Sequence, residues 1–221
     1  MDRTALITGF EPYGGRRQNP SGELATALDG ERIGDLVVVG RRLPVVFAGL
    51  AERLDECLVE AQPSVVLALG LWPGESMIRL ERLAVNLADS VAPDNAGAHR
   101  SGEPLDRSGA AALLTTLPLP AIEAALLAEG IPARLSNTAG TYLCNAALYA
   151  LLGAIARRGE HTPCGFIHLP YLPRQVAEML AGARHGGCDL HNRGDIASME
   201  MDTMMRAVRI ALAVAVGRGP G

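Results

Sequence analysis

The sequence predicts an α/β protein: a single domain built as a three-layer α/β/α sandwich with a mostly parallel, twisted sheet. Two observations lead to this prediction. The chain has 221 residues, a length that suits one sizeable α/β domain. Short apolar runs alternate along it with longer stretches of helical spacing, which is the pattern of βαβ units with helices on both faces of a sheet. No internal repeat or linker interrupts residues 1–221, so we expect one domain.

The expected strands are short and mostly apolar, which suits burial on both faces of the sheet; they are residues 5–8, 36–39, 65–69, 133–135 and 165–169. The expected helices lie between and after these strands, at residues 22–28, 46–60, 121–129, 142–157, 175–183 and 201–216. Residues 90–109 are rich in Gly, Pro and Asp and predict a long loop, a candidate cover for the site. Ligands of such sheets bind beyond the carboxyl ends of the strands.

Composition and charge exclude several classes of protein. The formal net charge is −4 and no run of Lys or Arg stands out, which argues against a nucleic-acid partner. The first residues lack a basic region followed by a long apolar run, so we expect no signal peptide. The longest apolar stretches, residues 65–72 and 210–216, are too short to span a bilayer, so no membrane partner is expected. We therefore expect a cytoplasmic protein whose cysteines stay free; they are Cys57, Cys144, Cys164 and Cys188.

The first segment with chemical interest is the loop Thr-Gly-Phe-Glu-Pro-Tyr-Gly-Gly at residues 8–15. It follows a strand and leads to a helix that Ser21 is expected to cap. Its glycines have the separation of a phosphate-binding loop, but Lys and Ser/Thr do not follow, so nucleotide binding is disfavoured. The loop is either an ordinary connection or part of a ligand pocket. Phe10 and Tyr13, two of only eight aromatic residues in the chain, favour the pocket.

Cys144 lies in the second segment, residues 136–145, where a polar turn precedes an Ala/Leu-rich helix. In the first turn of a helix, unpaired N–H groups and the positive dipole end favour a thiolate. The same N–H groups could hold the oxyanion of a tetrahedral intermediate. A cysteine that opens a helix is also a common small core residue, so Cys144 alone does not identify a nucleophile.

His168 ends a strand that otherwise reads as core, and Pro170 stops the strand just after it. This position puts an imidazole at the carboxyl edge of the sheet, where a general base is useful. A histidine at a strand end is often structural. Cys144 and His168 in successive βα units are harder to explain by packing, and together they suggest a nucleophile and its base.

Glu81 lies in a segment, residues 79–87, that we expect to be extended. Alternate residues of an extended chain share a face, so Glu81 is expected on an apolar side with Leu83, Val85 and Leu87. A buried carboxylate needs a partner. Two candidates stay open: a structural arginine such as Arg79 or Arg82, or the imidazole N–H of His168, which Glu81 would then orient.

Together these segments resemble the pyroglutamyl peptidase I family, also called pyrrolidone-carboxylate peptidases, which are cysteine peptidases. The resemblance covers nearly the whole chain and is carried by residues 8–15 with 19–20, 81–82 with Ala84 and Asn86, 93–95, 136–145, and 165–168 with Pro170. It implies that the chain removes an N-terminal pyroglutamyl residue from peptides, with Cys144, His168 and Glu81 as the catalytic triad. It also implies an α/β/α sandwich, no cofactor, no metal and, commonly, a homotetramer.

The resemblance further implies a substrate pocket. Aromatic rings at the positions of Phe10, Tyr13 and Tyr142 flank the pyroglutamyl ring in the family. Asn19 is expected to shape the pocket, and Leu71 to contact the lactam through its backbone. Pyroglutamate is a neutral lactam without a free α-amino charge, so an apolar slot with a few hydrogen bonds suits it.

Three positions depart from the family pattern, and the first is Leu71, where many members have Gln. Glu75 and Val91 stand where the family usually has arginine, and the arginine missing at Val91 lies near the catalytic site in relatives. Arg79, Arg82 and Arg100 are the candidates to replace it. If none does, the chain could be a non-catalytic binder of pyroglutamyl peptides that has lost turnover.

Two further alternatives remain. His-x-x-Cys spacing suits zinc and occurs at His161 with Cys164 and at His185 with Cys188, which His191 follows after two residues. That group offers no clear fourth ligand. The other alternative is a phosphorylase-like transferase on a similar sheet, for which no phosphate-binding set is apparent.

Overall fold

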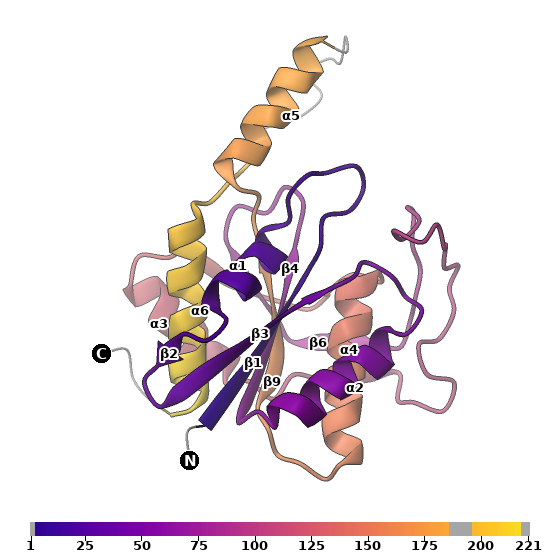
Figure 1. The fold of residues 1–221 in the computed structure, drawn as a ribbon, viewed down its shortest axis with the longest axis vertical. Helices are drawn as coiled ribbons and strands as arrows, with labels where there is room; N and C mark the ends of the chain where they lie inside the picture. Colours follow the sequence, from indigo (N-terminus) through magenta and orange to yellow (C-terminus); the bar gives the residue numbers. More distant parts are fainter. Residues whose placement is uncertain (1–2, 186–195, 218–221) are drawn as a thin grey trace.

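The computed structural model describes residues 3–185 and 196–217, and its centre is one seven-stranded sheet (Figure 1). The strand order is β2-β3-β1-β4-β9-β5-β8. These strands are β1 (Arg3–Phe10), β2 (Arg32–Ile33), β3 (Leu36–Leu43), β4 (Val65–Leu71), β5 (Ile78–Glu81), β8 (Ala133–Ser136) and β9 (Cys164–Leu169). A separate two-stranded sheet pairs β6 (Leu83–Val85) with β7 (Ala112–Leu114).

Helices cover both faces of the seven-stranded sheet. One apolar core joins the sheet to α1 (Pro20–Leu28), α3 (Leu119–Ala128) and α6 (Met201–Ala215). The opposite core joins it to α2 (Leu50–Ala61) and α4 (Leu143–Arg157). The predicted α/β/α sandwich is therefore confirmed. α5 (Pro173–His185) extends away from these layers (Figure 1).

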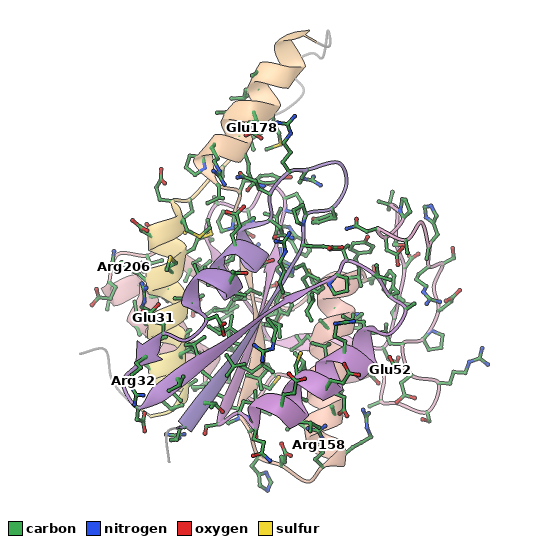
Figure 2. The ribbon with its side chains drawn as sticks, viewed as in Figure 1. Glu31, Arg32, Glu52, Arg158, Glu178 and Arg206 are labelled. Atoms are coloured by element: carbon green, nitrogen blue, oxygen red, sulfur yellow. The ribbon has the colours of Figure 1, made fainter. Side chains whose placement is uncertain are left out.

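The strands form where the sequence places apolar residues on both sides of the chain. All seven residues of β4 and all six of β9 are buried, as a central strand of a covered sheet requires. Charged side chains lie at the periphery, as Glu52 on α2, Arg206 on α6 and Glu178 on α5 illustrate (Figure 2). In the described part of the chain, we find no helix long and apolar enough to cross a membrane.

The sheet is mostly parallel, as predicted, but one strand runs the other way beside the site. β3, β1, β4 and β9 are parallel to one another, whereas β5 pairs antiparallel with β9 and parallel with β8. In this register, Arg79 lies opposite His168, and Glu81 lies opposite Phe166. Since paired residues point to the same face of a sheet, these four side chains share one face, the face of α4.

The predicted extended segment 79–87 is two strands in different sheets, because the chain breaks between β5 and β6 at Arg82. Glu81 is buried, as expected. Leu83 and Val85 are only half-buried, and Ala84 between them is the buried residue of β6. The predicted apolar face shared by Glu81, Leu83 and Val85 is therefore wrong. The short strands β2, β6 and β7 were not predicted either.

The start of α1 also differs from the prediction. The helix begins at Pro20, and its N-cap is Asn19, whose Oδ1 accepts a hydrogen bond from the Ser21 N–H at 3.2 Å. The Ser21 hydroxyl instead accepts from the Phe10 N–H at 3.0 Å and donates to Asn19 Oδ1 at 2.8 Å. The predicted Ser21 cap is wrong because Pro20 takes the first helical position, so the cap is Asn19, two residues earlier.

Two other predicted elements can be compared directly. α2 starts at Leu50 and not at residue 46, because Gly49 adopts a left-handed conformation with φ of 73° just before it. Residues 90–109 form the predicted irregular connection, pinned at its base by a bridge between Ala88 and Glu103.

Candidate active site

A histidine–glutamate pair lies buried at the carboxyl edge of the sheet. His168 is the fifth residue of β9 and is 1% exposed, and Glu81 ends β5 and is 0% exposed. His168 Nδ1 lies 2.8 Å from Glu81 Oε1. A carboxylate oxygen accepts, so Nδ1 carries the proton and Nε2 is left as an acceptor. The imidazole of His168, one of the two candidate partners of Glu81, is therefore a partner of Glu81 in the structure.

Cys144 is the second residue of α4, where backbone N–H groups have no partner within the helix. The thiol lies over Gly70 of β4: a Cβ atom at Gly70 would be 2.7 Å from Cys144 Sγ and 2.8 Å from Phe166 Cζ. Gly70 is also the residue that pairs with His168 in the sheet. The three predicted triad residues therefore meet on the α4 face, around a glycine that leaves room for the sulfur.

Burial sets the protonation of this cysteine and histidine. It raises the pKa of the Cys144 thiol to about 12, and the negative charge of Glu81 adds to the rise. It lowers the pKa of His168 below its usual 6.5, although the hydrogen bond that His168 donates to Glu81 opposes that shift. The resting pair is a neutral thiol and a neutral imidazole. Burial of Cys144 therefore opposes the effect of the helix N-terminus, which favours the thiolate.

Glu81 also has the arginine partner that the sequence left open. Arg79 is 5% exposed, and its Nε donates to Glu81 Oε1 at 2.7 Å. The guanidinium carbon lies 3.6 Å from the centre of the Trp72 ring, and that ring meets the His168 ring edge-on at 5.0 Å. Both candidate partners of Glu81 are thus correct, and they share one oxygen.

The other candidate arginines lie apart from Glu81. Arg82 donates to Asn137 Oδ1 at 3.0 Å, and Arg100 pairs with Glu103 at 2.9 Å. Val91, one of the positions that depart from the expected pattern, is fully exposed. Glu75, another of these positions, is buried and forms ion pairs with two arginines, Arg134 and Arg79.

The five predicted substrate-binding residues border one small cavity beside Cys144. Its lining consists of Phe10, Tyr13, Asn19, Val45, Leu71, Tyr142, Leu143 and Cys144. We call this cavity the aromatic slot. None of these lining residues is acidic or basic, and burial raises the pKa of both Tyr13 and Tyr142, so their hydroxyls stay neutral. The volume is about 20 Å³, room for one water molecule, so the slot is nearly closed.

Short contacts from the two loops hold the walls of this slot. Asn19 Nδ2 donates to the Glu11 carbonyl at 2.9 Å, which ties the helix cap to the loop that carries Tyr13. The Tyr142 hydroxyl donates to the Pro93 carbonyl at 3.1 Å. Residues 90–109 therefore touch one lining residue of the slot, Tyr142, although none of them lines the slot.

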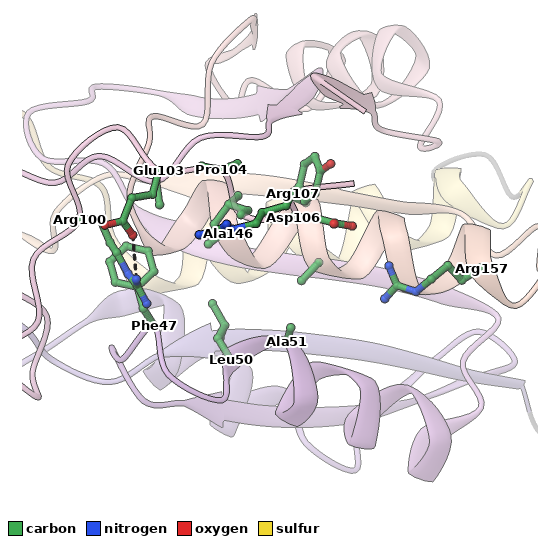
Figure 3. Close-up of a pocket in the computed structure, with 14 residues that line it drawn as sticks. Phe47, Leu50, Ala51, Arg100, Glu103, Pro104, Asp106, Arg107, Ala146 and Arg157 are labelled. Carbon is green, nitrogen blue, oxygen red and sulfur yellow. Dashed lines mark hydrogen bonds and ion pairs between the residues drawn. The ribbon is translucent and has the colours of Figure 1, made fainter. Parts of the chain in front are cut away.

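A roomier groove lies along α4 (Figure 3), and none of Cys144, His168 and Glu81 lines it. Its volume is about 470 Å³, and α2, α4 and the 100–107 loop line it. Phe47 stands between the two cavities: it lines the groove, and its ring meets Tyr142 of the slot edge-on at 5.5 Å. No nucleophile–base pair lines the groove, so the chemistry belongs to the smaller cavity.

The structure bears on the zinc alternative only in part. Within residues 3–185 and 196–217, no group of three or more His, Cys, Asp or Glu side chains is arranged to hold a metal ion. Cys164 is buried in β9 while His161 is exposed, so these two do not form a site together. Cys188 and His191 lie outside the described residues.

Two residues of the site were not singled out from the sequence. Gly70 interrupts an apolar strand, and a glycine inside a strand often marks a close approach of another group, so the signal was present. Trp72 is the single tryptophan and follows the same strand, but nothing in its spacing shows that Arg79 stacks on it.

The chain matches known proteins over nearly its full length. A family model described as pyroglutamyl peptidase matches residues 3–218. The pyrrolidone-carboxylate peptidase of Cupriavidus pinatubonensis is 43% identical over 212 residues, which cover 96% of this chain and 92% of that protein. The pyrrolidone-carboxylate peptidase of Pyrococcus furiosus is 41% identical over 212 residues, covering 96% and 97%.

The fold agrees with these sequence matches. X-ray structures of pyrrolidone carboxyl peptidase from Pyrococcus furiosus superpose with a TM-score of 0.88 at 40% identity and cover 96% of this chain and 98% of theirs. A family model that spans nearly the whole chain and two relatives above 40% identity lead to one conclusion: this chain belongs to the pyroglutamyl peptidase family.

Proposed function

We propose that this chain is a cysteine peptidase that removes the N-terminal pyroglutamyl residue from peptides. One observation carries the proposal: Cys144, at the head of α4, borders an uncharged aromatic slot on the same face as a histidine paired with a glutamate. Membership of the family, and relatives named pyrrolidone-carboxylate peptidase, support it.

The lining of the slot favours a lactam over a free amino terminus. Pyroglutamate is uncharged, and burying its ring between Phe10, Tyr13 and Tyr142 contributes roughly 1–3 kcal/mol. An N-terminal glutamine or glutamate carries an ammonium group, and no carboxylate lines the slot to pair with it. Desolvating that cation costs roughly several kcal/mol, which exceeds the gain from burying the side chain.

The neutral resting pair requires that the thiol lose its proton as it attacks. His168 Nε2 takes the proton of Cys144 Sγ, and the sulfur bonds to the pyroglutamyl carbonyl carbon. The N–H groups at the start of α4 hold the oxyanion. His168 then gives its proton to the leaving amine as the C–N bond breaks, and a water molecule hydrolyses the thioester. Glu81 keeps Nδ1 protonated throughout.

The slot must widen before it can take a ring, because its volume of about 20 Å³ is too small for a five-membered lactam. Tyr13 lies on the loop that carries Gly14 and Gly15, whose φ angles are 60° and 74°. Movement of this loop would open the wall that Tyr13 forms.

A comparison of three substrates tests the proposed function. The purified protein is given matched pyroglutamyl, glutaminyl and prolyl amides of one chromogenic amine, beside the variant Cys144→Ala as control. We expect release of the amine from the pyroglutamyl substrate alone, and none from the variant. Comparable rates on all three substrates would contradict the specificity. Binding of the pyroglutamyl amide without turnover would establish the alternative, a non-catalytic binder.

The remaining expectations are part of the same proposal. We propose that residues 1–221 form one catalytic domain, which the single seven-stranded sheet with its two covering helix layers supports. A homotetramer and a cytoplasmic location are also proposed. Light scattering on the purified protein measures the first, and fractionation of cells measures the second.

A further inference from the structure

Arg79 is a buried arginine whose guanidinium is hydrogen-bonded and stacked against residues around His168. Its Nε donates to Glu81 Oε1 at 2.7 Å and to Ser136 Oγ at 3.0 Å, and its Nη2 donates to the Thr138 carbonyl at 2.6 Å. One face of its guanidinium lies on the Trp72 ring. An arginine with these contacts cannot turn outward to solvent, so its charge is fixed beside Glu81.

We infer that Arg79 is a positioning residue of the triad, which fixes the Glu81 carboxylate toward His168 and supplies a permanent positive charge beside it. The inference rests on the proposed function, because it assigns the residue that tunes the base of that reaction. It also selects one arginine among the three candidates, since Arg82 and Arg100 have other partners.

The geometry gives Arg79 the first part of this role. Glu81 Oε1 accepts from both His168 Nδ1 and Arg79 Nε, at 2.8 and 2.7 Å. Glu81 Oε2 is buried without a hydrogen-bond partner among the described residues. The orientation of the carboxylate therefore depends on one oxygen, and Arg79 is the group besides the imidazole that holds that oxygen in place.

The charge of Arg79 gives it the second part. The charged and titratable groups that face His168 are Glu81 and Arg79 from β5, Glu75 from the turn before β5, and the Cys144 thiol from α4. Glu81 and Glu75 favour the imidazolium, and Arg79 disfavours it. Without Arg79, the negative charge of Glu81 would act in full on His168 and raise its pKa. It would also oppose the thiolate more strongly.

The test measures the pH dependence of kcat/KM and of Cys144 alkylation by iodoacetamide. For Arg79→Gln, we expect the acid limb of both profiles to move to higher pH by about one unit, and kcat at the optimum to fall about tenfold. Arg79→Lys keeps the charge and loses the forked geometry, so its acid limb should stay while its kcat falls. Glu75→Gln removes a negative charge and should move the limb to lower pH.

Arg82→Gln is the matched control, because it removes one positive charge next to Glu81 in the sequence from a side chain that points outward. Its profile should equal that of the wild type. Equal profiles for Arg79→Gln and Arg82→Gln would overturn the inference, as would loss of stability in Arg79→Gln with an unmoved acid limb.

A double variant keeps the inference testable if Arg79→Gln fails to fold. Arg79→Gln with Glu75→Gln removes both members of a buried ion pair, so no unpaired charge remains between them. Its acid limb should still lie above that of Glu75→Gln alone; coincidence of the two would overturn the inference. Alkylation needs no substrate, so it reports on Arg79 even if the wild type does not hydrolyse pyroglutamyl amides.

Discussion

Among single residues, Gly70 decides where the nucleophile can lie. A side chain at this position would meet Cys144 Sγ at 2.7 Å and the Phe166 ring at 2.8 Å, distances that real Cβ contacts do not reach. Gly70 is the last residue but one of the buried strand β4 and pairs with His168 of β9, so its backbone cannot shift alone. Glycine is therefore needed here because the Cys144 thiol and the Phe166 ring occupy the space of a side chain.

Gly70→Ala tests this requirement. We expect the added methyl group to push the thiol out of line, with a loss of about a hundredfold in kcat/KM and slower alkylation of Cys144. Overpacking should also cost about 1–3 kcal/mol of folding free energy. Gly182→Ala is the control, because a Cβ there meets nothing within 4 Å. Unchanged kinetics in Gly70→Ala would show that the thiol lies elsewhere in the working enzyme.

At the scale of elements, the start of α1 links helix stability to the substrate slot. Asn19 caps the helix through Oδ1 and reaches the Glu11 carbonyl through Nδ2, and its own side chain lines the slot. The cap, the loop that carries Tyr13 and the slot are thus one connected unit. A change at Asn19 should be felt in both stability and substrate binding.

Two variants at this position separate those effects. Asn19→Ala removes the cap and should lower the free energy of unfolding by about 1 kcal/mol and the melting temperature by about 2–4 °C. It should also raise KM for the pyroglutamyl amide. Asn19→Ser keeps a good cap but is too short to reach Glu11, so it should restore the melting temperature and leave KM high. A wild-type KM in both variants would mean that the cap does not shape the slot.

The antiparallel direction of β5 is the other decisive feature at this scale. Because β5 is antiparallel to β9, Arg79 lies opposite His168 near the carboxyl end of β9. Glu81, at the end of β5, lies opposite Phe166, two residues further into the sheet. Arg79 and Glu81 therefore both lie beside the imidazole of His168, and Glu81 is the more deeply buried of the two. A parallel β5 would have placed the carboxylate at the exposed end of the strand.

For the whole molecule, the buried neutral histidine couples the site to folding. His168 has a lowered pKa in the folded protein, whereas in the unfolded chain it titrates near its ordinary 6.5. As the pH falls through 6.5, His168 is protonated in the unfolded chain but stays neutral in the folded protein. Stability from this group is therefore present above pH 6.5 and is lost below it.

Denaturant unfolding between pH 5 and 7.5 measures this coupling. We expect the free energy of unfolding to decrease as the pH falls below 6.5, by up to about 1.4 kcal/mol per pH unit from one histidine. His168→Gln should flatten that slope. His161→Gln, at an exposed histidine, should leave it unchanged. A slope in His168→Gln equal to that of the wild type would mean that the histidine is not held neutral.

The sequence by itself determined the layered fold, most of its elements and the residues that meet at the site. Apolar runs and helical spacing are local properties, so the strands and helices could be predicted, with errors at their ends where a cap or a glycine decides. The motifs around Cys144 and His168 indicated the proposed nucleophile and base for the same reason, because the position of a residue within a helix or strand can be predicted from the local sequence.

The tertiary structure alone decided how those residues act on one another. Protonation depends on burial, which no local pattern reports, and burial raises the pKa of the Cys144 thiol. The partners of Glu81 depend on the direction of β5 and on the register Arg79–His168, which arise from pairing between distant strands. The slot volume depends on how β1, the loop after it, β4 and the start of α4 pack together. Each is a property of contacts between segments far apart in the sequence, and the chain specifies them only once it has folded.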